Sequence, residues 1–191
     1  MLKKKVGFSI SEAMKWIIVA AICFVGGNTN VKGQCELGTP ADYRPEELEG
    51  LWYVDYMFPS LKFVNASNMF DLNGAVYNVR SNVIFPDVGS PRNYDGTWTI
   101  NGNNKTITID YPDLPDFYGS YIVQAIQKDQ YAFVRGCPAS APEGLTLIML
   151  RERCPDGSVE SMLAEETEVL GVPFEDFIED LVVKIECSQQ E

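Results

Sequence analysis

Eight short segments of alternating apolar and polar residues, with no helical pattern between them, most constrain the fold of this chain. Side chains on a strand point alternately to opposite faces, so this alternation predicts strands that each turn one face toward a core. The segments are residues 50–58, 63–72, 75–79, 96–100, 105–111, 120–127, 130–137 and 145–151. Short connections favour antiparallel neighbours. We therefore predict an all-β fold, either an up-and-down antiparallel barrel or a sandwich.

The first segment opens with a glycine and a large aromatic residue. Gly50 lets the chain bend sharply into the strand, and Trp52 is large enough to form the floor of a cavity. Strict alternation places Trp52, Val54, Tyr56 and Phe58 on one side, which we expect to face the core.

Turn residues separate the later segments. The Asn73-Gly74 pair is a strong hairpin signal. Residues 101–104 and the pair Lys128-Asp129 predict two more hairpins. A stretch with proline and glycine, from about Phe85 to Asp95, predicts a loop.

Helical periodicity appears only after the eighth segment. Residues 156–158 offer an N-cap, and Gly171 with Pro173 predicts the helix end. The apolar stripe between them comprises Val159, Met162, Leu163, Val169 and Leu170. A helix with one apolar stripe needs a surface to cover, so we expect a C-terminal α-helix packed on the outside of the sheet. Phe174, Phe177, Ile178 and Leu181 suggest one more helical turn, and Val182–Cys187 a short ninth strand.

The N-terminus has the pattern of a secretory signal. Four lysines, at positions 3, 4, 5 and 15, precede an apolar run over residues 16–25. A run of about ten residues is too short to span a bilayer, so no stable membrane anchor is expected. We predict that residues 1–33 form the signal, cleaved near Gly33 or near Gly27. Residues 34–191 then form a single secreted, extracellular domain.

Cysteine usage agrees with an extracellular protein. Cys23 leaves with the signal, and the remaining four cysteines predict two disulfides with three possible connectivities. These cysteines are Cys35, Cys137, Cys154 and Cys187. Two sequons, at Asn65 and Asn104, predict glycosylation on the same route.

Charge and composition exclude several functions. Residues 34–191 hold 10 of the 15 basic and 26 of the 27 acidic residues, a net charge of −16 that disfavours nucleic acid. The absence of histidine excludes a Ser-His-Asp triad, an imidazole-bound haem and a histidine zinc site. Paired cysteines would leave no thiolate nucleophile. Glu165, Glu166 and Glu168 are expected on a solvated helix face. We therefore predict a protein that is not an enzyme and has no metal site or cofactor.

Three stretches, in this order, resemble the lipocalin family. They are Gly50-Leu51-Trp52-Tyr53, the segment 130–137 (Gln-Tyr-Ala-Phe-Val-Arg-Gly-Cys), and the segment 147–151, which ends in an arginine just before the helix. By these motifs the chain is most similar to the apolipoprotein D and invertebrate pigment-binding lipocalins. The resemblance implies an eight-stranded barrel whose closed end is formed by Gly50, Trp52 and Arg151, with the arginine packed over the tryptophan. One departure is Ile126-Gln127, where the family usually has Thr-Asp.

The resemblance also implies the disulfide pairing. Lipocalins of this kind join the cysteines equivalent to Cys35 and Cys137. They also place a cysteine early in the second strand, where this chain has Leu61-Lys62-Phe63. We therefore infer a different second bridge, Cys154–Cys187.

A lipocalin barrel implies binding and transport of a small hydrophobic ligand. Alternation predicts the residues that line the cavity: Val54, Tyr56, Ala66, Asn68, Phe70, Tyr77, Trp98, Ile107, Ile109, Tyr121, Val123, Ala132, Val134, Leu147 and Met149. Asn68 and Tyr121 would be the polar contacts in this lining. A flat or elongated molecule with one polar end fits such a site, for example a retinoid, carotenoid, bilin, steroid or fatty acid.

Two other functions stay open. The barrel could instead bind or inhibit a protein through exposed apolar loop tips at residues 57–59 and 83–86. An isomerase-like lipocalin would need a free cysteine or another activated group in the cavity. Fold by itself does not decide between these functions.

Overall fold

The computed structural model describes residues 35–58, 65–85, 89–102, 105–153, 157–169 and 173–179. Nine strands, one α-helix and three short 3₁₀ helices form along these residues. In chain order they are η1 (Pro45–Leu48), β1 (Gly50–Phe58), β2 (Asn65–Asn73), β3 (Val76–Ile84), β4 (Pro91–Asn101), β5 (Thr106–Asp110), η3 (Pro115–Phe117), β6 (Gly119–Gln127), β7 (Tyr131–Pro138), β8 (Leu145–Leu150), α2 (Gly157–Val169), η4 (Phe174–Asp176) and β9 (Ile178–Glu179).

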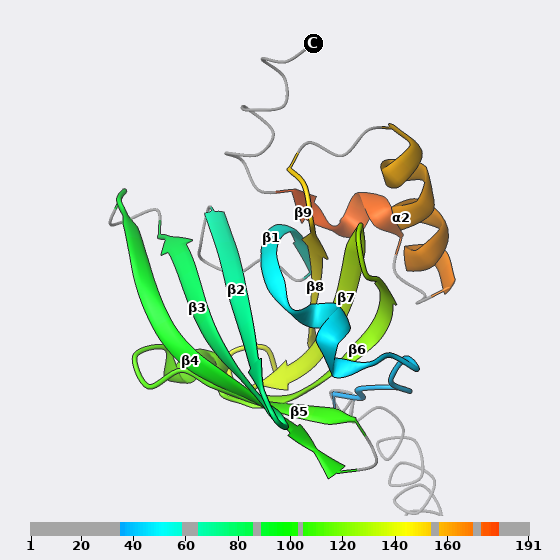
Figure 1. The fold of residues 1–191 in the computed structure, drawn as a ribbon. Helices are drawn as coiled ribbons and strands as arrows, with labels where there is room; N and C mark the ends of the chain where they lie inside the picture. The colour runs from blue at the N-terminus through cyan, green and yellow to red at the C-terminus, as the bar shows by residue number, and fades with distance from the viewer. Residues whose placement is uncertain are drawn as a thin grey trace, which may run out of the picture. The chain divides into compact units, whose positions relative to one another are not determined.

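The first eight strands form a closed antiparallel barrel (Figure 1). Each strand from β2 to β7 pairs with the next along the chain, and β8 pairs with β1. The ring closes because β1 also pairs with β2, from Gly50 opposite Phe70 to Val54 opposite Ala66. The up-and-down barrel predicted from the sequence is confirmed.

The short ninth strand continues the edge of β1 where β2 has ended. Ile178 lies opposite Met57, and Glu179 lies opposite Tyr56. One more helical turn was predicted from Phe174 onward, but the chain makes only the 3₁₀ turn of Phe174–Asp176 and extends again at Ile178. The predicted strand at Val182–Cys187 lies outside the described residues.

Two bulges change which side chains face the interior. The pairing of β1 with β8 shifts between Val54 and Tyr56, and that of β6 with β7 shifts between Val123 and Ala125. An extra residue in a strand reverses the faces that follow it. Consequently Met57 packs in the interior, whereas Tyr56 packs outside it. The prediction that Tyr56 and Phe58 face inward with Trp52 and Val54 is wrong for this reason.

Apolar side chains form two separate cores. The first fills the barrel, and its largest fully buried members include Trp52, Trp98, Tyr77 and Tyr121. The second lies outside the barrel and joins Leu163 of α2 to residues of β1, β7 and β8 such as Tyr56, Phe133 and Ile148. The Tyr131 hydroxyl also donates to Glu166 of the helix at 3.0 Å. The helix therefore covers the outside of the sheet, as predicted, although Glu166 is not simply solvated.

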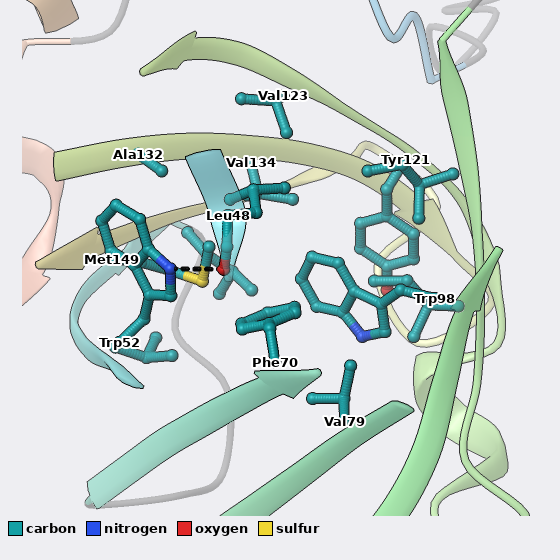
Figure 2. Packing of buried hydrophobic residues seen from close by; sticks show 14 of the residues in the cluster. Leu48, Trp52, Phe70, Val79, Trp98, Tyr121, Val123, Ala132, Val134 and Met149 are labelled. Atoms are coloured by element: carbon teal, nitrogen blue, oxygen red, sulfur yellow. Dashed lines mark hydrogen bonds between the residues drawn. The ribbon is translucent and has the colours of Figure 1, made fainter. Parts of the chain in front are cut away.

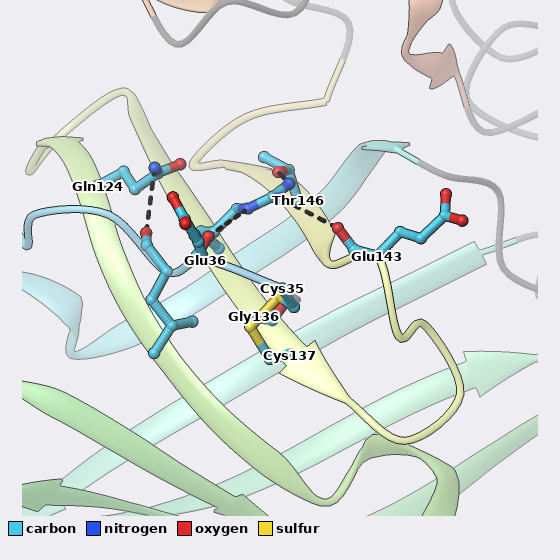
Figure 3. Close-up of a disulfide and its surroundings, with 9 residues drawn as sticks. Cys35, Glu36, Gln124, Gly136, Cys137, Glu143 and Thr146 are labelled. Carbon is cyan, nitrogen blue, oxygen red and sulfur yellow. Dashed lines mark hydrogen bonds between the residues drawn. A yellow bond between two sulfur atoms is a disulfide. The ribbon is translucent and has the colours of Figure 1, made fainter. Parts of the chain in front are cut away.

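The N-terminal arm is attached to the outside of β7 (Figure 3). The predicted disulfide between Cys35 and Cys137 is confirmed. Gln124 Nε2 donates to the carbonyl of Leu37 at 3.4 Å, and Arg135 Nε donates to the carbonyl of Glu36 at 3.4 Å. These contacts fix the start of the arm on the outer face of β6 and β7, and the arm then continues to η1 at the closed end of the barrel.

The closed end has the arrangement that the resemblance implied. The guanidinium carbon of Arg151 lies 3.7 Å from the centre of the Trp52 ring. The indole Nε1 of Trp52 donates to the carbonyl of Leu48 at 2.8 Å. Gly50 adopts a φ of +92°, which favours glycine, and its α-carbon faces the Arg151 guanidinium.

The predicted loop from Phe85 to Asp95 is partly wrong. β3 extends to Ile84, and β4 begins at Pro91. Pro91 can start β4 because it opposes Ile84 at the very end of the ladder, where a missing N–H matters least.

The two apolar loop tips expected for a protein-binding function are also corrected. Met57 and Val83 are buried, while Phe58 and Phe85 pack against Phe177 and Tyr94. These described residues therefore do not form exposed apolar tips.

Several other predictions fall outside the described ranges. They concern the signal at 1–33, Cys154, Cys187 and Asn104, together with the side chain of Asn65. No helix within the described part of the chain is long and apolar enough to cross a membrane. Within the same ranges, no group of three or more His, Cys, Asp or Glu residues is placed to hold a metal ion.

Candidate functional site

A cavity of about 50 Å³ lies inside the barrel, toward the end opposite Arg151. Its lining comes from β1 to β6, from β8 and from the connection between β5 and β6. The lining residues are Val54, Ala66, Asn68, Ser81, Val83, Trp98, Ile109, Tyr111, Leu114, Phe117, Tyr121 and Leu147. Most of these side chains are apolar, and none of them is ionised at neutral pH. The site therefore suits an uncharged or weakly polar molecule.

Four polar side chains form a hydrogen-bonded chain in this lining. Ser81 Oγ lies 2.6 Å from Asn68 Oδ1 and 2.7 Å from the Tyr111 hydroxyl. Trp98 Nε1 donates to the same Tyr111 hydroxyl at 3.2 Å. All four residues are buried. A buried polar chain inside an apolar barrel needs such mutual contacts, because an unpaired buried polar group is costly.

Trp98 separates the cavity from the filled half of the barrel. Its ring packs edge-on against Phe70, with centroids 4.7 Å apart, and nearly parallel to Tyr121, with centroids 6.4 Å apart (Figure 2). Phe70 does not line the cavity and packs in turn against Tyr77. The tryptophan ring therefore forms the cavity floor.

Two glycines make room for the two tyrosines of the site. A Cβ atom at Gly96 would overlap the ring of Tyr111, and one at Gly136 would overlap the ring of Tyr121. Burial raises the pKa of Tyr111 to about 12, in spite of the hydrogen bonds with Ser81 and Trp98. Burial also raises the pKa of Tyr121 well above its ordinary value. Both hydroxyls are therefore protonated at neutral pH.

The connection between β5 and β6 supplies the remaining wall. Leu114 and Phe117 are half-buried and line the cavity. The Tyr121 hydroxyl donates to the Phe117 carbonyl at 2.9 Å, and Ser140 Oγ donates to the Asp116 carbonyl at 2.6 Å. These two hydrogen bonds hold the connection against the barrel, so its apolar side chains occupy space inside the mouth.

The structure divides the predicted lining into three groups. Seven residues line the cavity: Val54, Ala66, Asn68, Trp98, Ile109, Tyr121 and Leu147. Seven others fill the barrel interior without lining it: Phe70, Tyr77, Ile107, Val123, Ala132, Val134 and Met149. Tyr56 alone lies in the outer core, beyond the bulge in β1.

Five lining residues were not predicted. Ser81 and Val83 continue the alternation of Tyr77 and Val79, so extending the third strand would have placed them inside. Tyr111 likewise follows the alternation of the fifth strand. Leu114 and Phe117 stand in an irregular segment with two prolines, where no period indicates the direction of a side chain.

A larger hollow, of about 630 Å³, lies on the outer face of β2 to β5. Its floor includes Arg80 and Asp95, which form an ion pair of 2.9 Å with both side chains mostly exposed. An exposed ion pair is well solvated and leaves little to be gained by binding. The interior cavity is therefore the candidate functional site.

No protein-family model and no curated protein sequence matches the chain, but solved structures match its fold. The major allergen Per a 4 from cockroaches gives a TM-score of 0.64 at 18% identity, covering 77% of this chain and 94% of that one. The amine binding protein of Rhodnius prolixus, in its tryptamine complex, gives a TM-score of 0.63 at 14% identity, covering 81% of this chain and 90% of that one. Lobster apocrustacyanin A1 gives a TM-score of 0.59 at 15% identity, covering 71% of this chain and 78% of that one. The fold is that of the lipocalins.

The lipocalin fold agrees with the resemblance found in three stretches of the sequence. At identities this low, the likeness shows the fold alone. The finer similarity to apolipoprotein D stays a prediction.

Proposed function

We propose that this lipocalin binds a small, mainly apolar molecule in the cavity above Trp98 and carries it outside the cell. The observation that carries the proposal is the buried polar chain of Asn68, Ser81, Tyr111 and Trp98 in an otherwise apolar lining. A barrel that needed only to be filled would be more stable with apolar side chains at these positions. A few convergent polar groups in an apolar cavity are typical of a ligand site.

The size of the cavity sets a condition on binding. A volume of about 50 Å³ holds one or two water molecules, whereas ligand sites measure roughly 300–1,000 Å³. A ligand must therefore displace side chains. Leu114 and Phe117 are the most readily displaced, because they belong to the connection between β5 and β6, with its short 3₁₀ helix η3, and not to a strand. We propose that this connection moves outward when the ligand enters.

The lining supports a proposal for the class of ligand. Trp98 and Tyr121 offer nearly parallel aromatic faces, which suit a flat ring or a conjugated chain. Retinoids, carotenoids and bilins have this character, whereas a steroid or a fatty acid with one polar end would fit through the apolar lining alone. The tryptamine complex of the amine binding protein of Rhodnius prolixus provides an example of an aromatic ligand bound by a protein of this fold.

An extracellular location has two supports. The disulfide between Cys35 and Cys137 is of a type that persists in oxidising compartments. The N-terminal pattern of lysines and a short apolar run is typical of a secretory signal. We propose that residues 34–191 are the mature domain.

Tryptophan fluorescence tests the proposal, since Trp52 and Trp98 are the two tryptophans of residues 34–191 and only Trp98 lines the cavity. Retinol, a bilin and a long-chain fatty acid are titrated into the wild type, Ala66→Phe and Met69→Phe. Ala66 points into the cavity, whereas Met69 on the same strand is 46% exposed. We expect saturable changes with at least one compound in the wild type and Met69→Phe, and their loss in Ala66→Phe. Equal binding by the wild type and both variants, or binding by none of the three proteins, would contradict the proposal.

A further inference from the structure

We infer that the cavity selects a ligand whose polar end is a hydrogen-bond acceptor, such as a carbonyl oxygen, and that the side-chain amide of Asn68 is the group that recognises it. This inference deepens the proposed function and rests on it. It follows from the direction of the hydrogen bonds inside the barrel.

The direction is determined by counting hydrogens. Ser81 has one hydroxyl hydrogen, which it donates to Asn68 Oδ1. The contact between Ser81 and Tyr111 must then be donated by Tyr111, which is protonated because burial raises its pKa to about 12. Tyr111 in turn accepts from the indole N–H of Trp98, which is a donor only. Every hydrogen therefore points the same way, from Trp98 toward Asn68.

This hydrogen-bonded chain ends at Asn68, whose amide donor has only a weak acceptor. Asn68 Oδ1 accepts from Ser81, but Asn68 Nδ2 carries two hydrogens. Within the described part of the chain, its one partner is the thioether sulfur of Met149, at 3.9 Å. Sulfur is a weak acceptor. Asn68 is only 6% exposed, so solvent water does not readily supply a stronger acceptor in its place. A ligand that brings an acceptor to this buried donor therefore binds more favourably.

The lining also disfavours a cationic end. Its twelve residues include no Asp or Glu, and the buried carboxylate of Asp55 on β1 is not among them. Moving an ammonium group into an apolar site without a counter-charge is costly. The site should therefore reject amines, although a protein of the same fold binds tryptamine.

The test compares three compounds with the same phenyl ring: acetophenone, ethylbenzene and α-methylbenzylamine. They carry, respectively, an acceptor, no polar group and a cation. A ketone is better solvated by water than a hydrocarbon, so each compound is compared between variants of the protein by calorimetric titration. The variants are Asn68→Leu, Asn68→Asp and Asn78→Leu, the last being an exposed asparagine on the outer face of the neighbouring strand.

The expected result is specific to both compound and variant. Asn68→Leu should weaken the binding of acetophenone about three- to tenfold, and it should leave the binding of ethylbenzene unchanged or make it slightly tighter. Asn78→Leu should change neither. Asn68→Asp replaces the amide NH₂ donor by a carboxylate oxygen acceptor, so α-methylbenzylamine should bind at least about tenfold more tightly than to the wild type. This gain keeps the inference testable if the leucine variant folds poorly.

The outcomes separate this inference from the proposed function. If acetophenone and ethylbenzene bind the wild type and Asn68→Leu affects them equally, the acceptor selectivity is wrong while ligand binding stands. Tighter binding of the amine than of the ketone by the wild type would likewise overturn the selectivity alone. If neither neutral compound binds the wild type, the proposed ligand site is wrong together with the inference.

Discussion

Arg151 lies with its guanidinium carbon 3.7 Å from the centre of the Trp52 ring and donates to three backbone carbonyls. These carbonyls belong to Glu47 at 3.1 Å, Leu51 at 3.0 Å and Lys128 at 2.9 Å. One side chain therefore joins the segment before β1, β1 itself and the turn between β6 and β7. This contact closes the barrel at the end away from the cavity.

Arg151→Ala should destabilise the protein by about 2–3 kcal/mol, because it removes a cation–π contact and three hydrogen bonds. Arg80→Ala is the matched control, since its ion pair with Asp95 is exposed and worth less than about 1 kcal/mol. Urea unfolding followed by far-ultraviolet circular dichroism measures both. A loss for Arg151→Ala no larger than that for Arg80→Ala would show that the closed end does not depend on this residue.

Phenylalanine substitution of two buried tyrosines near the closed end should change the stability of the protein in opposite directions. The Tyr43 hydroxyl is buried without a hydrogen-bond partner within the described residues, whereas the Tyr77 hydroxyl donates to the Pro45 carbonyl at 2.7 Å. Tyr43→Phe should stabilise the protein by roughly 1 kcal/mol, and Tyr77→Phe should destabilise it by a similar amount. Thermal unfolding of both variants checks the sign. A destabilised Tyr43→Phe would mean that this hydroxyl is satisfied.

Stability should fall steeply at alkaline pH. Burial raises the pKa of Tyr43 and of Tyr111 to about 12 from the ordinary value of 10.0. The unfolded chain therefore releases these protons first, so their contribution is complete below pH 10.0 and is lost between pH 10.0 and about pH 12. Each tyrosine adds up to about 1.4 kcal/mol per pH unit to the slope in that window. Urea unfolding at several pH values should give a shallower slope for Tyr111→Phe, and an unchanged slope would contradict the account.

The disulfide should contribute more to stability than any single contact of the arm. Cys35 and Cys137 are 102 residues apart, and closing a loop of that length restricts the unfolded chain by about 4–5 kcal/mol in the chain-entropy model. In urea unfolding, the double variant Cys35→Ser and Cys137→Ser should show a free energy of unfolding that is lower by roughly 3–5 kcal/mol. Gln124→Ala, which removes the long hydrogen bond to the Leu37 carbonyl, should lose less than about 1 kcal/mol. Similar losses in the two variants would count against the entropic explanation.

Opening the mouth should favour binding. Leu114→Ala removes an apolar side chain from the cavity wall, so it should increase ligand affinity and the association rate severalfold. Tyr118→Ala is the matched control, because Tyr118 belongs to the same connection and is 58% exposed. Stopped-flow tryptophan fluorescence with the best compound from the titrations measures the rates. A slower association in Leu114→Ala, or an equal change in both variants, would show that Leu114 is not the barrier to entry.

The barrel could be predicted because its signals are local. Period-two alternation and turn residues such as Asn73-Gly74 specify strands and hairpins without knowledge of distant contacts. The strand at Ile178–Glu179 was not predicted, because its position depends on where β2 leaves the edge of β1. That is a property of the closed sheet and not of the residues around Ile178.

The site was predicted in part for a similar reason. Alternation placed Trp98, Asn68 and Tyr121 in the interior, but it could not show the bulge that turns Tyr56 outward. It also could not distinguish side chains that line the cavity from those that fill the barrel. That distinction depends on packing in three dimensions, above all on where the Trp98 ring lies.

Native mass spectrometry of the secreted protein would show whether the barrel carries a ligand. The protein is taken from its own source or from a eukaryotic host, and its native mass is compared with that of the denatured, deglycosylated chain. We expect an additional mass of a few hundred daltons that is lost on denaturation, and its absence from Ala66→Phe prepared in the same way. A native mass equal to that of the bare chain, with no compound bound in solution by the wild type, would contradict a ligand site inside the barrel.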